Sequence, residues 1–550
     1  MDSSNKTGQG SDRCFTRANA RRDLGNEKFD LLVVGGGIAG ACAAWDAALR
    51  GVRVALIEKG DFGSGASAHS LKILHGGIRY LQHLDFARVR ATCTERAAFL
   101  RIAPHLTRPL AFAVPTYGRG MQGRLALRAA FLANALLTSR RNRGVDSAER
   151  RIPHPYLLSR SEFMSTLPAF ARPGLTGAGV FFDGQILDPP RLVYSIVRSA
   201  QEAGAVASNY CTAQRLLIRD GHAAGVLAQD VVTAETFEIR ARVVANMAGP
   251  WAPLLHALGG ASDRISVPVT RDLALAVNRR LLPDIGVALQ TRFRDPGAVL
   301  SRGNIHLFLA PWRESFTLIG VNSRNYDGHP DGLTVSEAEI EAFITQINEA
   351  APDLHIRRDD VTVVNAGLLP TGQNPPGRRD LTFGKRSLLI DHAVRGGPRG
   401  LITGMSVLFT MGRALAERVI DLTLEKLDQP SRTCRTATTE VWRSACSSVS
   451  TNSGVAALSR KTALDEVAYV ARDEMVVTLA DVMLRRLDLG TARQPSDAVL
   501  NACAHIVGRE LGWNGERQRL EVERMRASYP FASPESQAFV PASPPLRCAS

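Results

Sequence analysis

The stretch Val33-Val34-Gly35-Gly36-Gly37-Ile38-Ala39-Gly40 decides the fold of this chain. Its glycines fit the pattern GxGxxG, which marks a turn between a strand and a helix that binds a dinucleotide. Gly35 allows the tight turn, Gly37 lets the backbone approach a pyrophosphate, and Gly40 lets the helix pack closely on the strand. The phosphates would then lie at the positive N-terminus of the helix. We therefore predict a dinucleotide site that includes Gly36.

The residues on either side of this stretch complete a strand–helix–strand unit. The hydrophobic pattern predicts a strand at 29–34, a helix at 38–50 and a second strand at 52–57. Glu58 ends the second strand, at close to the roughly 20-residue offset expected for the acid that binds the ribose. A carboxylate there accepts hydrogen bonds from the ribose hydroxyls and repels a 2′-phosphate, which disfavours NADP.

A second segment favours FAD over NAD. Residues 242–251 consist of an apolar strand followed by Ala248 and Gly249. This pattern resembles the second strand-plus-glycine segment of dinucleotide-binding flavoproteins, where the chain comes close to the cofactor for a second time. The chain has no further GxGxxG that would serve a separate nicotinamide. We expect FAD as the cofactor, reduced by the substrate itself.

Composition limits the remaining function classes. The chain has 550 residues, which predicts two to four domains. Its net charge of +14 favours anionic partners, but no nucleic-acid-binding module is recognised, so nucleic acid is not an expected partner. The eight cysteines form no CxxC pair, which indicates reduced thiols in the cytoplasm and no metal site.

Changes in composition along the chain predict its organisation. The polar residues 1–28 are expected to be a disordered leader, and no apolar stretch is long enough to span a bilayer. A helix at 121–138 carries arginines and is either an ordinary packed helix, which we favour, or a surface for acidic lipid. The expected divisions are an FAD domain at about 29–100, 185–262 and 375–428, a substrate domain at about 101–184 and 263–374, a linker at 429–453, a helical domain at 454–529 and a loose tail at 530–550.

The segment from Gly60 to Leu81 identifies a family. Its sequence, GDFGSGASAHSLKILHGGIRYL, closely resembles the FAD-dependent glycerol-3-phosphate dehydrogenases, in which a Ser-rich loop, a lysine and a His-Gly-Gly-Leu-Arg-Tyr motif pass the flavin. The resemblance extends over about residues 29–525. The matching positions in this segment are Ser67, Ser70, Lys72, His75, Gly76, Gly77, Arg79 and Tyr80.

The resemblance implies a fold, a reaction and a set of site residues. The fold is an α/β (α+β) one, with a Rossmann-like FAD-binding domain of the amino-acid-oxidase type, a mixed β substrate domain and a C-terminal helical domain. The reaction is oxidation of a secondary alcohol, with electrons passed to quinone or another acceptor. Further cofactor contacts are expected from Ser67, Ser70, Lys72 and Gly404, and the catalytic candidates are Arg79, His75 and Tyr80. For Arg79 a salt bridge is the alternative, and for His75 we favour packing of the loop.

The chain departs from the family at the substrate end. Leu369 and Leu408 replace a substrate-binding arginine and a lysine, and Ala274 and Asn322 replace a histidine and a threonine. Replacing cations with leucine removes charge-assisted binding of a phosphate. The sequence therefore predicts a related but less charged small-molecule substrate.

Other interpretations stay open. The chain could be an amine or amino-acid oxidase whose flavin is reoxidised by oxygen, or a flavin-binding relative without activity. We expect a cytoplasmic protein, with peripheral contact to the inner face of the membrane as an option, and a homodimer is left open.

Overall fold

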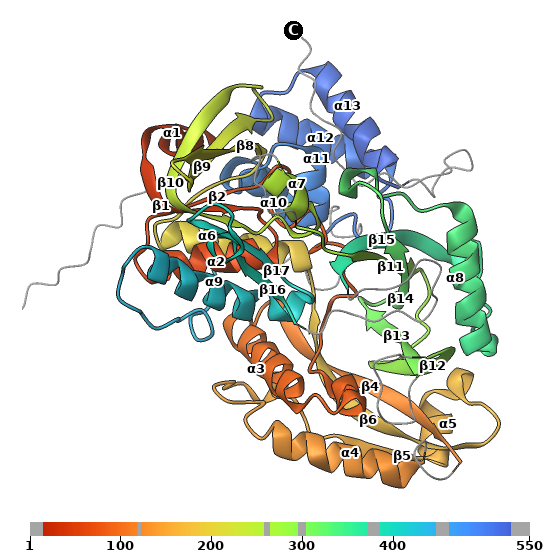
Figure 1. Cartoon of the computed structure of the whole chain (residues 1–550). Coiled ribbons are helices and arrows are strands. Elements are labelled where there is room, and N and C mark those ends of the chain that lie inside the picture. The colour runs from red at the N-terminus through yellow and green to blue at the C-terminus, as the bar shows by residue number, and fades with distance from the viewer. Residues whose placement is uncertain are drawn as a thin grey trace, which may run out of the picture.

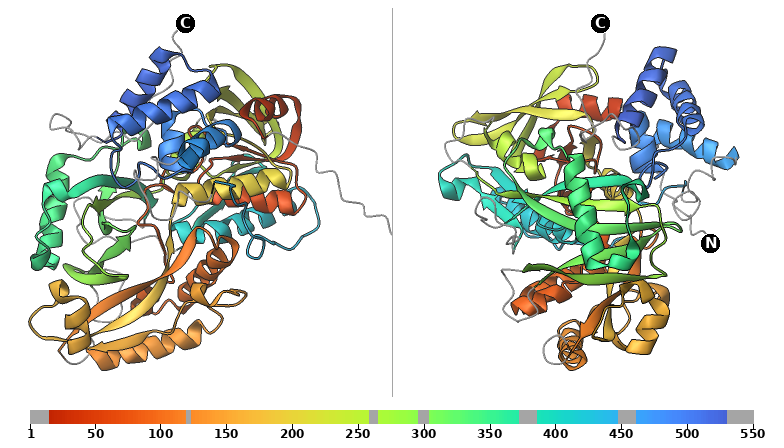
Figure 2. Two further views of the ribbon diagram at one scale, coloured as in Figure 1. Left: turned by 180° about the vertical axis from the view of Figure 1, so that it is seen from behind. Right: turned by 90° about the vertical axis from the view of Figure 1, so that its right-hand side faces the viewer.

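The computed structural model describes residues 15–118, 123–257, 265–294, 304–371, 386–446 and 461–529. Two β-sheets lie side by side, and a group of helices at the C-terminal end packs against them (Figures 1 and 2). The first sheet contains the strand that leads into the glycine-rich turn, and the second contains most of the strands that lie between residues 107 and 370.

The first sheet has a parallel centre. The strand β1 (Lys28–Val34) pairs in parallel with β2 (Val54–Ile57) on one side and with β10 (Thr236–Asn246) on the other. Parallel strands buried on both faces need continuous apolar runs, and β1 and β2 have them. The order is β16-β17-β10-β1-β2-β7, with a hairpin of β8 and β9 attached to β10. The remaining bounds are β7 (Val206–Ser208), β8 (Cys211–Arg219), β9 (His222–Asp230), β16 (Leu388–Asp391) and β17 (Leu401–Met405).

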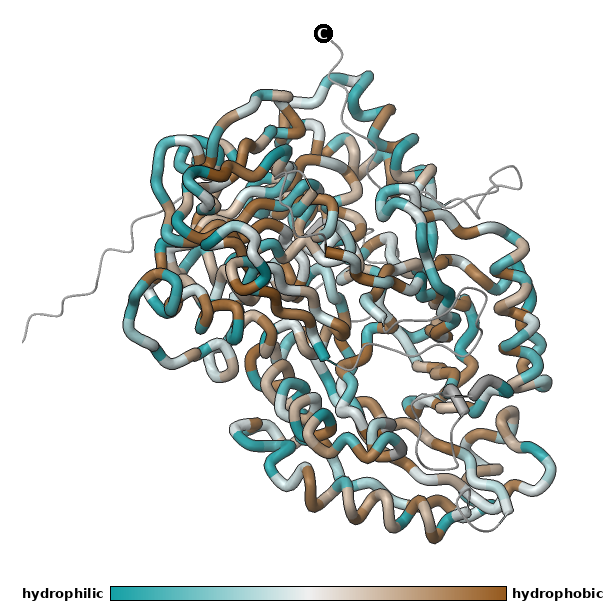
Figure 3. The backbone as a smooth tube through the Cα atoms, viewed as in Figure 1, coloured by the Kyte–Doolittle hydropathy of each residue, from teal (hydrophilic) through white to brown (hydrophobic). Residues whose placement is uncertain are grey.

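The helix α2 (Ile38–Leu49) joins β1 to β2 and lies at the centre of the domain. It packs between α6 (Pro189–Glu202) and α9 (Gly412–Lys426), and nearly all of its residues are buried. Its alanines and glycine allow this close approach on two sides. Figure 3 shows hydrophobic segments gathered where α2 and the parallel strands meet. The predicted strand–helix–strand unit is therefore confirmed.

The second sheet is mostly antiparallel and has the order β15-β11-β14-β13-β12-β4-β6-β3, with β5 attached to β6. The helix α8 (Glu337–Ala350) packs its apolar side on one face, and the other face turns toward the first sheet (Figure 2). The strands are β3 (Ile73–Leu74), β4 (Thr107–Tyr117), β5 (Tyr156–Ser159), β6 (Leu175–Ile186), β11 (Val269–Val277), β12 (Ile285–Arg294), β13 (Asn304–Trp312), β14 (Phe316–Tyr326) and β15 (Val361–Pro370).

Helices outside the two sheets complete the molecule. Near the second sheet lie α3 (Phe86–Ile102), α4 (Arg124–Leu137) and α5 (Arg160–Thr166), and α7 (Ala252–Ala257) follows β10. The C-terminal helical domain has its own hydrophobic core. It consists of α10 (Lys461–Asp473), α11 (Leu479–Asp481), a π-helical turn (Val482–Arg486), α12 (Asp497–Leu511) and α13 (Gly515–Ala527).

The expectation of a disordered leader is wrong for the part that the structure describes. Residues Arg17–Asn26 form the helix α1, capped by the side chain of Thr16. Ala20 and Leu24, four residues apart, are buried against the first sheet. Arg17 makes an ion pair with Asp230 on β9, so the polar composition of this helix is part of its docking. The first 14 residues lie outside the described part.

Among the helices in the described ranges, none combines the length and the apolar character that crossing a bilayer requires.

Candidate functional site

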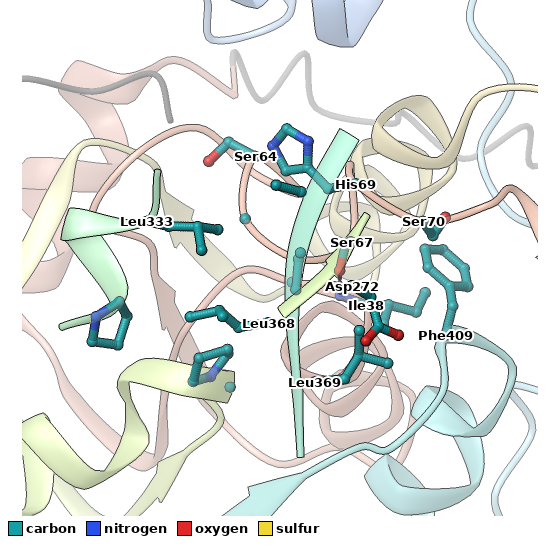
Figure 4. A pocket seen from close by; sticks show the side chains of 18 of the residues that line it. Ile38, Ser64, Ser67, His69, Ser70, Asp272, Leu333, Leu368, Leu369 and Phe409 are labelled. Atoms are coloured by element: carbon teal, nitrogen blue, oxygen red, sulfur yellow. Dashed lines mark hydrogen bonds between the residues drawn. The ribbon is translucent and has the colours of Figure 1, made fainter. Parts of the chain in front are cut away.

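A cavity of about 1870 Å³ lies between the two sheets. Ordinary small-molecule pockets have volumes of roughly 300–1,000 Å³, so this cavity can hold a ligand of dinucleotide length together with a second small molecule. Its walls come from the glycine-rich turn, the loop after β2, strands of the second sheet, the segment after β17, and the C-terminal domain. Figure 4 shows Ser67, Ser70 and Phe409 around the interior, with Leu369 close by.

The glycine-rich turn has the steric properties that the pattern predicts. Gly35 has a φ of +111°, and a Cβ there would lie 2.6 Å from the carbonyl oxygen of Met247. A Cβ on Gly40 would lie 1.8 Å from the carbonyl oxygen of Gly35, which only glycine avoids. A Cβ on Gly37 would instead enter the cavity, with the hydroxyl of Ser67 as its nearest neighbour at 3.2 Å. Two of the glycines therefore fix the backbone, and the third leaves room for a ligand.

Glu58 and the loop that follows it are bonded to this turn. One carboxylate oxygen of Glu58 accepts the backbone N–H of Gly36 at 2.7 Å, and the other accepts that of Gly60 at 2.9 Å. Burial raises the pKa of the Glu58 carboxyl, while these two bonds act in the opposite direction. The hydroxyl of Ser67 accepts the N–H of Ile38 at 3.0 Å, at the start of α2. Glu58 and Ser67 line the cavity, as do Ser70, Ala248, Gly249 and Gly404.

His75 and Asp183 form a histidine–carboxylate pair in the cavity wall. Nδ1 of His75 lies 3.3 Å from an oxygen of Asp183 on β6. The other Asp183 oxygen accepts the N–H of Gly76 at 2.6 Å and the guanidinium of Arg96 at 2.8 Å. Burial alone would raise the pKa of Asp183, but its bonds to His75, Arg96 and Gly76 lower it, so it stays a carboxylate. The side chain of His75 is partly exposed to the cavity.

The remaining sequence-predicted residues lie in different surroundings. Tyr80 lines the cavity from the short helix η1 (Ile78–His83), with the guanidinium of Arg88 3.8 Å from its ring centre. The backbone of Arg79 belongs to η1, but its side chain lies outside the described part. Lys72 is buried with its ammonium group 4.9 Å from the ring centre of Trp312, and it is not among the lining residues. This position does not support the predicted contact of Lys72 with the cofactor. Gly36 and Gly40 lie behind the cavity wall, under the turn.

The positions that depart from the family pattern lie mainly at the second sheet. Leu369 on β15 and Leu408 after β17 line the cavity, and so does Asn322 on β14. The amide of Asn322 donates to Gln346 on α8 at 2.7 Å. Ala274 on β11 is buried beside Gly320. The wall near Leu369 and Leu408 is thus apolar at these two positions.

Two lining residues were missed by sequence reasoning. His69 lies in the loop after β2 and is half-buried near Asn365, and desolvation lowers the pKa of its imidazole to about 4. Asp272 on β11 places a carboxylate beside Leu369 (Figure 4). The only available signal for His69 was a histidine within a loop of Ser, Ala and Gly. For Asp272 no local signal exists, because a lone acid in a strand is also typical of a surface position.

The site fits a flavin dinucleotide. A cradle that only glycine permits, the N-terminus of α2 and the carboxylate of Glu58 meet in one cavity. Within the residues that the structure describes, no group of three or more His, Cys, Asp or Glu side chains could hold a metal.

Comparison with known sequences gives two family matches. Residues 30–422 match the family described as FAD dependent oxidoreductase, and residues 438–518 match the C-terminal domain of alpha-glycerophosphate oxidase. A glycerol-3-phosphate dehydrogenase of Synechocystis is 30% identical over 426 residues, which cover 76% of this chain and 73% of that protein. A probable glycerol-3-phosphate dehydrogenase of Encephalitozoon cuniculi is 29% identical over 92% of this chain and 85% of its own length.

Comparison with solved structures supports the same fold. The glycerol-3-phosphate dehydrogenase of Bacillus halodurans, solved in complex with FAD, superimposes with a TM-score of 0.70 at 23% identity. The match covers 95% of this chain and 99% of that one, so it includes the C-terminal helical domain. The predicted fold class is confirmed.

Proposed function

The chain belongs to the FAD-dependent oxidoreductases and, among them, to the glycerol-3-phosphate dehydrogenase family, and from this premise we propose that it oxidises a secondary alcohol related to glycerol 3-phosphate. FAD, bound along the glycine-rich turn, supplies the hydride acceptor. The observation that carries the proposal is the His75–Asp183 pair, because it places a proton acceptor in the wall of the cofactor cavity.

In this proposal His75 takes the proton of the substrate hydroxyl. Asp183 accepts a hydrogen bond from Nδ1–H, which leaves Nε2 as the nitrogen that can accept a proton. Asp183 is held by Arg96 and Gly76, so it orients the imidazole and stabilises its charged form after the transfer. His75 is thus the catalytic base and Asp183 a positioning residue. Tyr80 and Arg79, which follow on the same short helix, are proposed to help hold the substrate.

We further propose that the substrate carries less negative charge than glycerol 3-phosphate. Leu369 and Leu408 present apolar side chains to the cavity, and Asp272 adds a carboxylate on the same side as Leu369. A phosphate dianion gains most from bidentate cations and is repelled by a nearby carboxylate. An uncharged or cationic secondary alcohol meets neither difficulty.

Anaerobic reduction of the bound flavin tests both proposals. The purified protein is loaded with FAD, and loss of the visible absorption band of the oxidised flavin is followed after each substrate is added. Rapid bleaching by an uncharged secondary alcohol and slow bleaching by glycerol 3-phosphate would support the full proposal. Rapid bleaching by glycerol 3-phosphate would support the reaction but contradict the altered specificity. A protein that does not take up FAD would contradict the function itself.

We also propose that electrons pass to a quinone at an acidic membrane surface, which α4 contacts. On this helix Leu125, Leu132 and Leu136 are 81%, 61% and 80% exposed, and their spacing places them on one face. Arg124 and Arg128 are exposed on the same helix. Exposed leucines beside arginines are typical of helices that lie at the interface of an anionic bilayer. In Figure 1 α4 lies at the edge of the molecule farthest from the C-terminal domain.

Sedimentation with vesicles that contain anionic lipid tests this contact. We expect the wild-type protein to sediment with the vesicles and the double variant Leu132→Glu, Leu136→Glu to stay in the supernatant. A matched control changes Leu520, an exposed leucine of the C-terminal domain, to Glu. Equal sedimentation of all three proteins would exclude α4 as the contact.

A further inference from the structure

A buried cluster of charges joins the loop after β2 to the C-terminal helical domain. We name residues 58–68 the cofactor loop, because most of them line the cavity. Asp61 lies in the middle of this loop and is buried. One of its oxygens accepts from Arg485 and Arg486, each at 2.8 Å. The other accepts from Arg486 at 2.9 Å and from Asn209 at 2.8 Å. We name Asp61, Arg485 and Arg486 the Asp61 cluster.

The cofactor loop is also bonded to the glycine-rich turn on its opposite side. The N–H of Gly63 donates to the carbonyl of Gly36 at 3.0 Å, and Glu58 accepts the N–H of Gly36. Ser67 accepts the N–H of Ile38 at the first turn of α2. The loop therefore lies between the turn that faces the cofactor and the domain that ends the chain.

The C-terminal domain is itself part of the cavity wall. Arg485 of the π-helical turn lines the cavity, and so do several residues from α11 to the end of α13. These are Thr478, Ala480, Glu521, Arg524, Met525, Ala527 and Ser528. The part of the molecule that contains the two β-sheets would by itself leave this side of the cavity open. The cavity is therefore complete only when the C-terminal helical domain is docked.

We propose that the Asp61 cluster couples docking of the C-terminal helical domain to retention of FAD, with Asp61 as a positioning residue. The inference rests on the FAD site of the proposed function. The cofactor loop is rich in Gly, Ser and Ala, so its backbone loses much entropy on ordering and needs fixed anchors. Asp61 provides the outer anchor through four hydrogen bonds, three of them charge-assisted on both sides, in a dry environment.

The arginines of the cluster have second partners, so the interface can be weakened without being destroyed. Arg485 also pairs with Asp481, and Arg486 also donates to the backbone carbonyl of Glu474 at 3.1 Å. The substitution Asp61→Asn keeps the shape of the side chain and the bond to Asn209 but removes the negative charge. It is therefore expected to loosen the cofactor loop while the two domains stay folded.

The experiment compares D61N with a matched variant of the same interface. Glu474→Gln is also a buried carboxylate-to-amide change, but the carboxylate of Glu474 accepts hydrogen bonds from Arg191 on α6 and from Ser444, and Nε of Arg486 lies farther from it, at 3.8 Å. Each protein is stripped of FAD, and the dissociation constant for FAD is measured by quenching of flavin fluorescence. The melting temperature of the apoprotein is measured beside it. If Asp61 had only a structural role, D61N and E474Q would both melt at lower temperatures, and their affinities for FAD would be alike.

We expect D61N to bind FAD at least tenfold more weakly than wild type and E474Q to stay within about threefold of it. Wild-type affinity of D61N, or an equal loss in both variants, would overturn the inference. If D61N does not fold, Arg486→Gln replaces it, because Arg486 does not line the cavity and Asp61 then keeps Arg485 and Asn209; unchanged affinity of that variant overturns the inference as well. A wild-type protein that does not bind FAD overturns the proposed function, and this outcome differs from the others.

Discussion

The glycine-rich turn allows a prediction that distinguishes a glycine required for packing of the fold from a glycine required for binding of the ligand. The perturbations are Gly40→Ala and Gly37→Ala, two additions of one methyl group three residues apart. At Gly40 the new Cβ would lie 1.8 Å from the carbonyl oxygen of Gly35, which is backbone and cannot rotate away. At Gly37 it would lie 3.2 Å from the Ser67 hydroxyl, which can move, and the extended backbone there (φ −75°) suits alanine.

The magnitudes follow from these contacts. For Gly40→Ala, α2 would have to shift by about 1 Å, but α6 and α9 hold it on two sides. Overpacking of this kind costs about 1–3 kcal/mol, and a backbone clash in a central helix belongs near the upper end. With about 2–4 °C lost per kcal/mol in a domain of this size, the apoprotein should melt about 6–12 °C lower. For Gly37→Ala the cost to the apoprotein should be under about 1 kcal/mol, but the methyl group occupies the path of the pyrophosphate.

The assay is a pair of measurements on each protein: the melting temperature without FAD, and the dissociation constant for FAD. Gly37→Ala is expected to melt within about 3 °C of wild type and to bind FAD at least tenfold more weakly, about 1.4 kcal/mol. Gly40→Ala is expected to show the large loss of stability even before FAD is added. Normal FAD affinity of Gly37→Ala, or a larger loss of apoprotein stability for it than for Gly40→Ala, would refute the reasoning.

Three further predictions concern the walls of the cavity. His75→Gln should lower kcat by about 10²–10⁴-fold with FAD affinity unchanged, and full turnover of this variant would exclude His75 as the base. His69 has a pKa lowered from 6.5 to about 4 by burial, with Lys72 adding to the effect, so the folded state binds fewer protons than the unfolded state between these values. Its stabilising contribution is complete above pH 6.5 and declines as the pH falls toward 4, by up to about 3 kcal/mol. His69→Gln should flatten this decline in urea titrations at pH 7 and pH 5, and an unaltered pH profile would show that other groups cause it. Leu369→Arg adds a cation to the cavity and should lower KM for glycerol 3-phosphate about tenfold or more, whereas an unchanged KM would show that this wall does not meet the phosphate.

The cofactor half of the fold could be predicted because its constraints are local in sequence. Gly35 has a positive φ within the turn, and a Cβ on Gly40 would meet the carbonyl oxygen of Gly35 in the same turn, so one short pattern describes both requirements. The helix α1 was missed for the opposite reason. Its buried face consists of Ala20 and Leu24 alone. Two apolar residues are too few to define a helical periodicity within a polar segment.

The Asp61 cluster and the His75–Asp183 pair show a second limit of sequence reasoning. Asp61 bonds arginines 424 and 425 positions later in the chain, and His75 meets a carboxylate 108 positions later. The residue types gave no indication of these contacts between positions far apart in the sequence, since an aspartate in a Gly-rich loop is also typical of an ordinary turn. Asp183 ties the loop that carries His75 to β6, because it accepts the backbone N–H of Gly76. Its contact with His75 adds a role that only the pairing of the β6 strand makes available.

The two ends of the cavity differ in how strongly the fold constrains their residues. This difference determines where substitutions can change the substrate specificity. At the cofactor end, substitution of Gly35 or Gly40 brings a side chain into backbone atoms, so any change disturbs the domain itself. At the substrate end, Leu369 and Leu408 are only partly buried and project from a strand and a loop into open space. Side chains in such positions can alter charge and shape at little cost in stability. A chain of this family can therefore keep its flavin chemistry while it exchanges a phosphate-binding wall for an apolar one. The substrate specificity of such a protein depends on Leu369, Leu408 and Asp272, and it must be tested by substitutions at these positions rather than inferred from the glycine-rich turn.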